Sequence, residues 1–213
     1  MCEFWHLLPR DGVRALEGLA LRFHPMRAIA LLLAFLAATA QATPVQFFGD
    51  STQVQAFEYL RDHFPGSTLR AVGGTRSDML LGGTDGLNRP WPASVAAPVV
   101  VINHGMNDAR PWAKVPLETY RANLRRLAKA SALVVFETPN PSTYPGRDTA
   151  PYAQAMREVA AEVGAPVIDV HACFQTLPEW RAALYDQVHP NDRGLRHIAD
   201  VCVAPRLREI MAR

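Results

Sequence analysis

The sequence predicts an α/β fold in which a flavodoxin-like parallel sheet of five strands, in the order 2-1-3-4-5, forms the middle of a three-layer α/β/α sandwich. Short apolar runs alternate with amphipathic helical patterns from residue 43 onward, as in chains built from strand-helix-strand units. The run 97–103 is rich in β-branched residues, which is typical of a strand buried on both faces. Glycines and small polar residues follow where the apolar runs end, and they indicate turns at one edge of the sheet.

The first predicted strand is the apolar run 45–48, which ends abruptly in Gly49, Asp50 and Ser51. Residues 53–63 then carry apolar positions at helical spacing. This arrangement puts Ser51 at the carboxyl edge of the sheet and at a helix N-terminus, where free N–H groups point outward. The position suits a nucleophile whose product is an oxyanion, and it also suits an ordinary N-cap serine. We expect Asp50 to accept hydrogen bonds within its own turn.

The later elements follow from the same alternation of patterns. Pro116 opens a clear amphipathic helix, because proline is well tolerated in the first turn. The stretch 171–185 is loosely patterned, so no element is predicted there. The other predicted elements are a strand at 67–72, a helical turn at 78–81, a loop at 82–92, strands at 97–103, 133–136 and 167–170, a helix over 152–163, and a closing helix after 191–192 that Pro205 breaks or restarts.

Four chemically suggestive residues follow strands of this predicted sheet. In the flavodoxin-like order, ligands bind beyond the carboxyl ends of the strands, at the switch point between the first and third strands. The turns after those two strands contain Ser51 and Asn107, and the turn after the second contains Gly74. The loop after the fifth strand leads to His189. We therefore expect these residues to converge on one edge of the sheet.

A serine hydroxyl needs a base to take its proton, and His189 is the candidate. Asp186 stands three residues earlier, so one helical turn would bring its carboxylate beside the imidazole. A carboxylate on Nδ1 fixes the histidine tautomer and stabilises the imidazolium. The Ser51 N–H, a glycine N–H from the turn after the second strand, and the Asn107 amide are candidate donors to the oxyanion.

Four motifs together resemble those of the SGNH (GDSL-like) hydrolases, in order and in their positions after strands. The resemblance covers nearly all of residues 43–213, which we take as a single domain of that family, and it implies the same three-layer sandwich. The motifs are Gly49-Asp50-Ser51, the Gly73-Gly74 turn, Gly105-Met106-Asn107-Asp108 and Asp186-Gln187-Val188-His189-Pro190. By resemblance, Ser51 is the nucleophile, His189 the base, Asp186 its partner, and Gly74 and Asn107 oxyanion donors.

The sequence departs from the family pattern in three places. Thr52 follows Ser51 where the family name has leucine, and Met106 stands where a small or polar residue is more usual. The Gly-Gly pair leaves the glycine donor open between Gly73 and Gly74, and comparison with the family turn favours Gly74.

We expect an ester hydrolase, an acyl or acetyl esterase, that needs no metal or cofactor. Its substrate would be a small-molecule, glycan or lipid ester, and the acyl length, the alcohol and the oligomeric state stay open. Two alternatives are an acyltransferase that moves an acyl group to a sugar hydroxyl on the same site, and a non-catalytic binding module of flavodoxin-like fold. The formal charge is only +2 and the chain has no dense Lys/Arg block, so no nucleic-acid partner is expected.

Aromatic residues and a histidine fall in loops at the expected active edge. Trp91, Trp112 and Tyr144 would either line the substrate site or pack locally. His104 precedes a glycine turn, where a structural hydrogen bond is the main expectation and site lining the other. Glu137, at the end of the fourth strand, is expected to be structural.

The N-terminal segment has the pattern of a secretory signal peptide. Met26 and Arg27 precede the apolar run 29–38, and Ala40-Gln41-Ala42 matches a cleavage site. The run is shorter than the roughly 20 residues that a membrane-spanning helix needs. We expect translation to begin at Met26, cleavage after Ala42, and export to the periplasm or beyond.

Cleavage would leave Cys173 and Cys202, for which we predict a disulfide, with two buried thiols as the alternative. No histidine stands at useful sequence spacing from them, so no metal site is expected.

Overall fold

The computed structural model describes residues 43–213, so the predicted signal peptide and translation start lie outside the described residues. Five parallel strands form one sheet in the order β2-β1-β3-β4-β5, as predicted. The strands are β1 (Val45–Gly49), β2 (Thr68–Ala71), β3 (Val99–Asn103), β4 (Leu133–Glu137) and β5 (Val167–Ile168). The switch point therefore lies between the carboxyl ends of β1 and β3.

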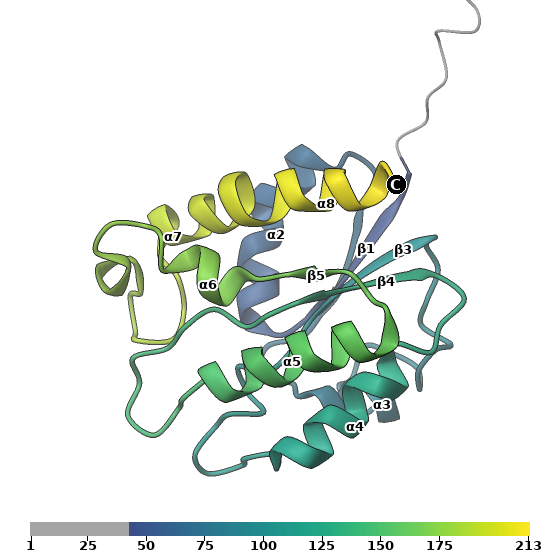
Figure 1. The fold of residues 1–213 in the computed structure, drawn as a ribbon, viewed down its shortest axis with the longest axis horizontal. Coiled ribbons are helices and arrows are strands. Elements are labelled where there is room, and N and C mark those ends of the chain that lie inside the picture. The colour runs from purple at the N-terminus through teal and green to yellow at the C-terminus, as the bar shows by residue number, and fades with distance from the viewer. Residues whose placement is uncertain (1–42) are drawn as a thin grey trace, which may run out of the picture. The chain divides into compact units, whose positions relative to one another are not determined.

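Alternating strand residues pack on opposite faces of the sheet. Phe47 belongs to one buried cluster and Phe48 to the other, and neither side chain is exposed. In register, Phe48 lies beside Ile102 of β3, and Ile102 lies beside Phe136 of β4. Figure 1 shows α3 (Ser77–Gly82), α4 (Leu117–Leu127) and α5 (Ala150–Val163) on one side of the sheet. It shows α2 (Ser51–His63) and α8 (Ala204–Met211) on the other. These layers confirm the predicted sandwich.

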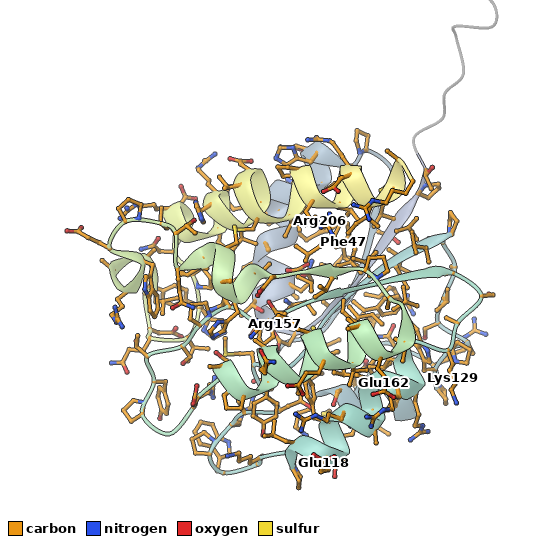
Figure 2. The ribbon with its side chains drawn as sticks, viewed as in Figure 1. Phe47, Glu118, Lys129, Arg157, Glu162 and Arg206 are labelled. Carbon is orange, nitrogen blue, oxygen red and sulfur yellow. A yellow bond between two sulfur atoms is a disulfide. The ribbon has the colours of Figure 1, made fainter. Side chains whose placement is uncertain are left out.

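The face that carries Phe47 (labelled in Figure 2) is covered by α2 and by the helices near the C-terminus. Asp50 caps α2, because its side chain accepts a hydrogen bond from the Thr52 N–H. The helical run that ends the chain contains a central π-helical segment, and Pro205 restarts the α-helix in the first turn of α8. The elements are α2 (Ser51–His63), α6 (Val170–Phe174), η1 (Trp180–Ala183), α7 (Asp192–Arg196), η2 (His197–Val203) and α8 (Ala204–Met211).

The opposite face is covered by α3 (Ser77–Gly82), α4 (Leu117–Leu127) and α5 (Ala150–Val163). Tyr120 and Tyr152 meet edge to face between α4 and α5, with ring centroids 5.1 Å apart. On the outer surface, Arg125 of α4 pairs with Glu162 of α5 at 2.8 Å, and Glu162 is labelled in Figure 2. Such exposed pairs contribute about 0–1 kcal/mol each, so packing of the apolar faces holds this layer.

The loosely patterned stretch 171–185 contains structure that the sequence pattern did not reveal. β5 is only two residues long, because Asp169 ends it and caps α6 by accepting a hydrogen bond from the Ala172 N–H. Arg157, labelled in Figure 2, reaches from α5 to the same Asp169 carboxylate at 3.1 Å. Helix α6 then places Cys173 against Cys202 of η2.

The predicted disulfide is present. The sulfur atoms of Cys173 and Cys202 are bonded at 1.98 Å, and their Cα atoms lie 5.7 Å apart. None of the helices formed by residues 43–213 has the length and apolar character to cross a membrane.

Candidate active site

The hydroxyl of Ser51 lies at the start of α2, and its Oγ atom is 2.8 Å from Nε2 of His189. The turn before it is tight because Gly49 has no side chain. A Cβ atom at Gly49 would lie 2.5 Å from the Gln53 Cβ and 2.7 Å from the Asn103 carbonyl oxygen. Any larger residue would push α2 away from the sheet, so the glycine is what sets Ser51 at the strand end.

His189 is held on its other side by Asp186. Its Nδ1 atom is 2.6 Å from Asp186 Oδ2, while Asp186 Oδ1 accepts hydrogen bonds from the backbone N–H groups of Val188 and His189. Burial alone would raise the pKa of Asp186, but the hydrogen bonds from His189 and Val188 outweigh burial and lower it below its ordinary value. The ionised carboxylate favours a proton on Nδ1, which leaves the Nε2 lone pair facing Ser51.

The loop that carries His189 is fixed by neighbours far apart in sequence. Asn140 donates a hydrogen bond from Nδ2 to the Val188 carbonyl at 3.0 Å, and the Thr143 N–H donates to the Gln187 carbonyl at 2.8 Å. Tyr185 stacks on the His189 imidazole, with ring centroids 5.7 Å apart and planes 18° apart. Sequence reasoning missed Tyr185, because nothing in its local pattern indicates a contact with the histidine.

Two backbone N–H groups near Ser51 are available to an oxyanion. Within residues 43–213, the N–H groups of Ser51 and Gly74 donate no hydrogen bond to a protein acceptor. Gly74 has φ +80°, a left-handed conformation that favours glycine, and a Cβ atom on Gly73 would lie 3.7 Å from the Ser51 Cβ. The Gly-Gly turn therefore approaches the serine closely.

The predicted third donor, Asn107, is buried and already hydrogen-bonded. Its Nδ2 atom donates to Asp50 Oδ2 at 3.0 Å and to the Thr75 carbonyl at 3.1 Å. Its Oδ1 atom accepts a hydrogen bond from Arg110, which agrees with this orientation of the amide. An oxyanion could receive an Asn107 hydrogen only if one of these bonds were shared or released.

A network of buried polar side chains holds the turn that carries Ser51. Asp50 Oδ1 accepts from both the N–H and the hydroxyl of Thr52 at 2.9 Å, as expected of a residue that braces its own turn. The Thr52 hydroxyl also lies 3.2 Å from Asn103 Oδ1, and Asn103 Nδ2 donates to Glu137 Oε1 at 3.2 Å. Threonine after the serine thus ties α2 to this network. Burial raises the pKa of Glu137 to about 8, and the charge of Asp50 adds to the effect.

The four predicted lining residues divide into two pairs. Trp112 is 64% exposed and Tyr144 is 39% exposed, and their rings meet edge to face with centroids 6.2 Å apart. Trp91 instead packs edge-on against Phe48 at 5.3 Å. His104 is buried, and its carbonyl accepts a hydrogen bond from the Tyr120 hydroxyl.

Sequence reasoning also missed two arginines beside the exposed pair. The guanidinium carbon of Arg110 lies 5.5 Å from the centre of the Trp112 ring. That of Arg147 lies 5.4 Å from the ring centres of both Trp112 and Tyr144. Arginine in a polar loop gives no sequence signal of its own, because only the meeting of two loops makes such a cluster.

The structure corrects one statement about the cysteines. His197 approaches Cys173 and Cys202, and the three candidate ligand atoms lie within 4.8 Å of one another. Sequence spacing did not predict this approach. Both sulfur atoms are bonded to each other, so the cluster has no thiolate to offer a metal while the disulfide is intact.

Comparison of the sequence with known protein families gives one match. The profile described as the GDSL-like Lipase/Acylhydrolase family matches residues 39–197, well over half of the chain. A comparison with curated proteins found no match.

Solved structures share the fold at low sequence identity. A lipase/acylhydrolase from Enterococcus faecalis is 20% identical with a TM-score of 0.64, covering 80% of this chain and 96% of that one. A catalytic mutant of an acetylxylan esterase from Geobacillus stearothermophilus is 22% identical with a TM-score of 0.61, covering 81% and 95%. A putative SGNH hydrolase from Slackia heliotrinireducens is 23% identical with a TM-score of 0.62, covering 78% and 100%.

Proposed function

Since the chain belongs to the GDSL-like lipase/acylhydrolase family and is a hydrolase that acts on ester bonds, we propose that Ser51, His189 and Asp186 form its catalytic triad. The observation that carries the proposal is the continuous chain of contacts from Asp186 through both nitrogens of His189 to the Ser51 hydroxyl. A binding module would have no need for a serine joined in this way to a histidine and a carboxylate.

In the proposed reaction, Ser51 Oγ attacks the ester carbonyl carbon while His189 Nε2 accepts the hydroxyl proton. His189 then returns the proton to the leaving alcohol, which gives an acyl-serine. Water enters, loses a proton to His189 and attacks the acyl-serine. The acid departs, and the proton returns to Ser51. Asp186 stays ionised throughout and stabilises the imidazolium.

The oxyanion of each tetrahedral intermediate would be bound by the N–H groups of Ser51 and Gly74, which point to no protein acceptor in the described part of the chain. We propose that Asn107 adds a third donor. Its amide would share the hydrogen now given to the Thr75 carbonyl, while its bond to the Asp50 carboxylate keeps the amide in place.

We further propose that the acyl group is small and that the ester belongs to a sugar. The exposed Trp112 and Tyr144 rings offer a flat surface of the kind on which sugar rings pack. The structural likeness to an acetylxylan esterase supports a small acyl group on a sugar. An acyltransferase would use the same acyl-serine, and transfer would reveal itself as turnover that requires a sugar acceptor.

We also propose that the protein is exported and that cleavage follows Ala42. The charged and apolar segment that begins at Met26 and the disulfide between Cys173 and Cys202 support this proposal. N-terminal sequencing of protein recovered outside the cytoplasm should begin at Thr43. A mature protein that retains residues 1–25 would refute the assignment.

The experiment that tests the activity is an assay of p-nitrophenyl esters from acetyl to long acyl chains, with Ser51→Ala alongside. We expect turnover that falls with chain length and vanishes in the variant. Turnover that peaks at long chains would replace the sugar ester with a lipid. Absence of serine-dependent turnover on every ester would overturn the proposed hydrolysis.

A further inference from the structure

Two arginine side chains beside the triad have no carboxylate partner within residues 43–213. None of the ion pairs in that part of the chain includes Arg110 or Arg147. Arg110 donates only to oxygens of uncharged groups, the Asn107 side-chain amide and the Gly74 carbonyl. The positive charge of both guanidinium groups is therefore left uncompensated by protein anions in contact.

Arg147 is the more unusual of the two. Its side chain lies in a residue only 7% exposed, and its Nε–H has no hydrogen-bond partner in the described part of the chain. Burial, and then the charge of Arg110, lowers the pKa of Arg147 below its ordinary value. Burying the Nε–H of Arg147 without a partner costs free energy, because this N–H loses water and gains no acceptor. The Nε–H of Arg110 is buried without a partner in the same way. Unsatisfied buried donors of this kind call for an explanation, and a bound acceptor would supply one.

The aromatic neighbours explain how the arginines are held. Trp112 lies within 5.5 Å of both guanidinium carbons, and Tyr144 lies 5.4 Å from that of Arg147. Ring faces attract a cation but accept no conventional hydrogen bond, so the in-plane N–H groups stay free for another acceptor. A planar fork of N–H donors matches a carboxylate or a phosphate in bidentate geometry.

The arginine cluster, formed by Arg110, Arg147, Trp112 and Tyr144, is joined to both halves of the active site. On one side, Arg110 contacts Asn107 and Gly74, the two residues assigned to the oxyanion. On the other side, the loop that ends in Arg147 is tied to the His189 loop, because Thr143 and Asn140 donate to carbonyls of Gln187 and Val188. A group bound by the arginines would therefore belong to a substrate whose ester lies at Ser51.

We propose that the ester substrate carries an anionic group, a carboxylate or a phosphate, which Arg110 and Arg147 bind next to the Trp112 and Tyr144 rings. The inference deepens the proposed ester hydrolysis and rests on it. It specifies that the preferred ester carries a negative charge and is not neutral.

The first test compares 4-acetoxybenzoate with its neutral methyl ester, which releases a similar phenol. We expect a higher kcat/KM for the anionic ester. The ratio of the two values should fall ~10-fold or more in Arg147→Gln, because a charge-assisted hydrogen bond contributes roughly 1.5–3 kcal/mol. Arg147→Lys should recover part of the ratio. Arg126→Gln, an exposed arginine on α4, should keep it.

Because each ratio is taken within one variant, a general loss of folded enzyme cancels. Equal ratios in wild type and Arg147→Gln would overturn the inference while the hydrolysis of both esters still supported the proposed function. An equal fall of this kcat/KM ratio in Arg126→Gln would show that net surface charge alone is responsible. That result would also overturn the inference.

The second test separates the two anions and does not depend on turnover. Glucuronate, glycerol 3-phosphate and glucose would be titrated calorimetrically into Ser51→Ala and into Ser51→Ala with Arg147→Gln. Tighter binding of glucuronate than of glucose identifies a carboxylate, and tighter binding of glycerol 3-phosphate identifies a phosphate, provided that Arg147→Gln weakens it. If neither anion binds more tightly than glucose, the proposal is overturned. This outcome does not depend on whether the protein hydrolyses esters.

Discussion

The side-chain amide of Asn107 donates a hydrogen bond to the carboxylate of Asp50 at 3.0 Å, so the residue before Ser51 orients a proposed oxyanion donor. Asp50 also accepts two hydrogen bonds from Thr52. One fully buried carboxylate thus fixes both the first turn of α2 and the amide across the switch point. Each residue of the glycine-aspartate-serine motif therefore has its own role: Gly49 allows the tight turn, Asp50 holds its neighbours, and Ser51 contacts His189.

Removing that donor should slow the chemical step. We predict that Asn107→Ala lowers kcat by about 10²–10³ and changes KM much less, because an oxyanion donor acts mainly in the transition state. Steady-state kinetics on p-nitrophenyl acetate would measure both constants. Asn88→Ala, which removes another buried asparagine whose side chain makes hydrogen bonds with Arg70 and Asp85, is the control for lost stability. An Asn107→Ala enzyme with near-native kcat would exclude the amide from the oxyanion site.

The proposed triad predicts unequal losses of kcat for substitutions of its three members. Ser51→Ala and His189→Ala should each lower kcat by at least ~100-fold, and Asp186→Asn should cost less, because His189 keeps its contact with Ser51. Asp192→Asn changes an exposed carboxylate close by in sequence and serves as the control. A His189→Ala enzyme that kept native kcat would refute the assignment of the base.

Glu137 makes stability depend on pH. Its pKa is about 8 in the folded protein and 4.5 ordinarily, so between these values the folded state holds a proton that the unfolded chain has lost. The free energy of unfolding should therefore fall as pH rises through this window, by on the order of a few kcal/mol from this group. Glu137→Gln should remove that contribution.

Thermal melting of wild type and Glu137→Gln at pH 5 and pH 8.5 tests the prediction, because pH 5 lies near the lower end of this window and pH 8.5 lies just above its upper end. The Tm of the variant relative to wild type should rise between the two conditions. Glu118→Gln, on the exposed surface of α4, should show no such trend. A constant difference for Glu137→Gln would mean that the buried carboxyl does not titrate in this window.

The disulfide should contribute strongly to stability. Cys173 and Cys202 lie 29 positions apart in the sequence. Closing a loop of that length lowers the entropy of the unfolded chain, which stabilises the folded state by about 3–4 kcal/mol. Replacing both with alanine should lower the free energy of unfolding by that amount, as measured by urea denaturation. A loss below ~1 kcal/mol would show that the unfolded chain gains little freedom when the bond is absent.

The sheet and the positions of the main site residues were predictable, because strand exits in a parallel sheet share one edge. Ser51 and Asn107 follow strands that pair directly, so topology alone brings them together. Helix α6 was not predictable, because five residues are too few to show a helical period. The arginine cluster and the approach of His197 to the cysteines depend on loops that meet only after folding.

The bond between Cys173 and Cys202 also encloses Asp186 and His189 within one covalent ring, while Ser51 lies outside it. Reduction should therefore loosen the loop that carries His189 and leave the turn that carries Ser51 as it was. Activity would then fail at reductant concentrations that leave the sheet folded, which parallel assays of hydrolysis and circular dichroism would detect. We therefore expect a chain that folds in a reducing compartment to be inactive until the bond between Cys173 and Cys202 forms. Oxidation of these cysteines would then be the step that activates the folded protein.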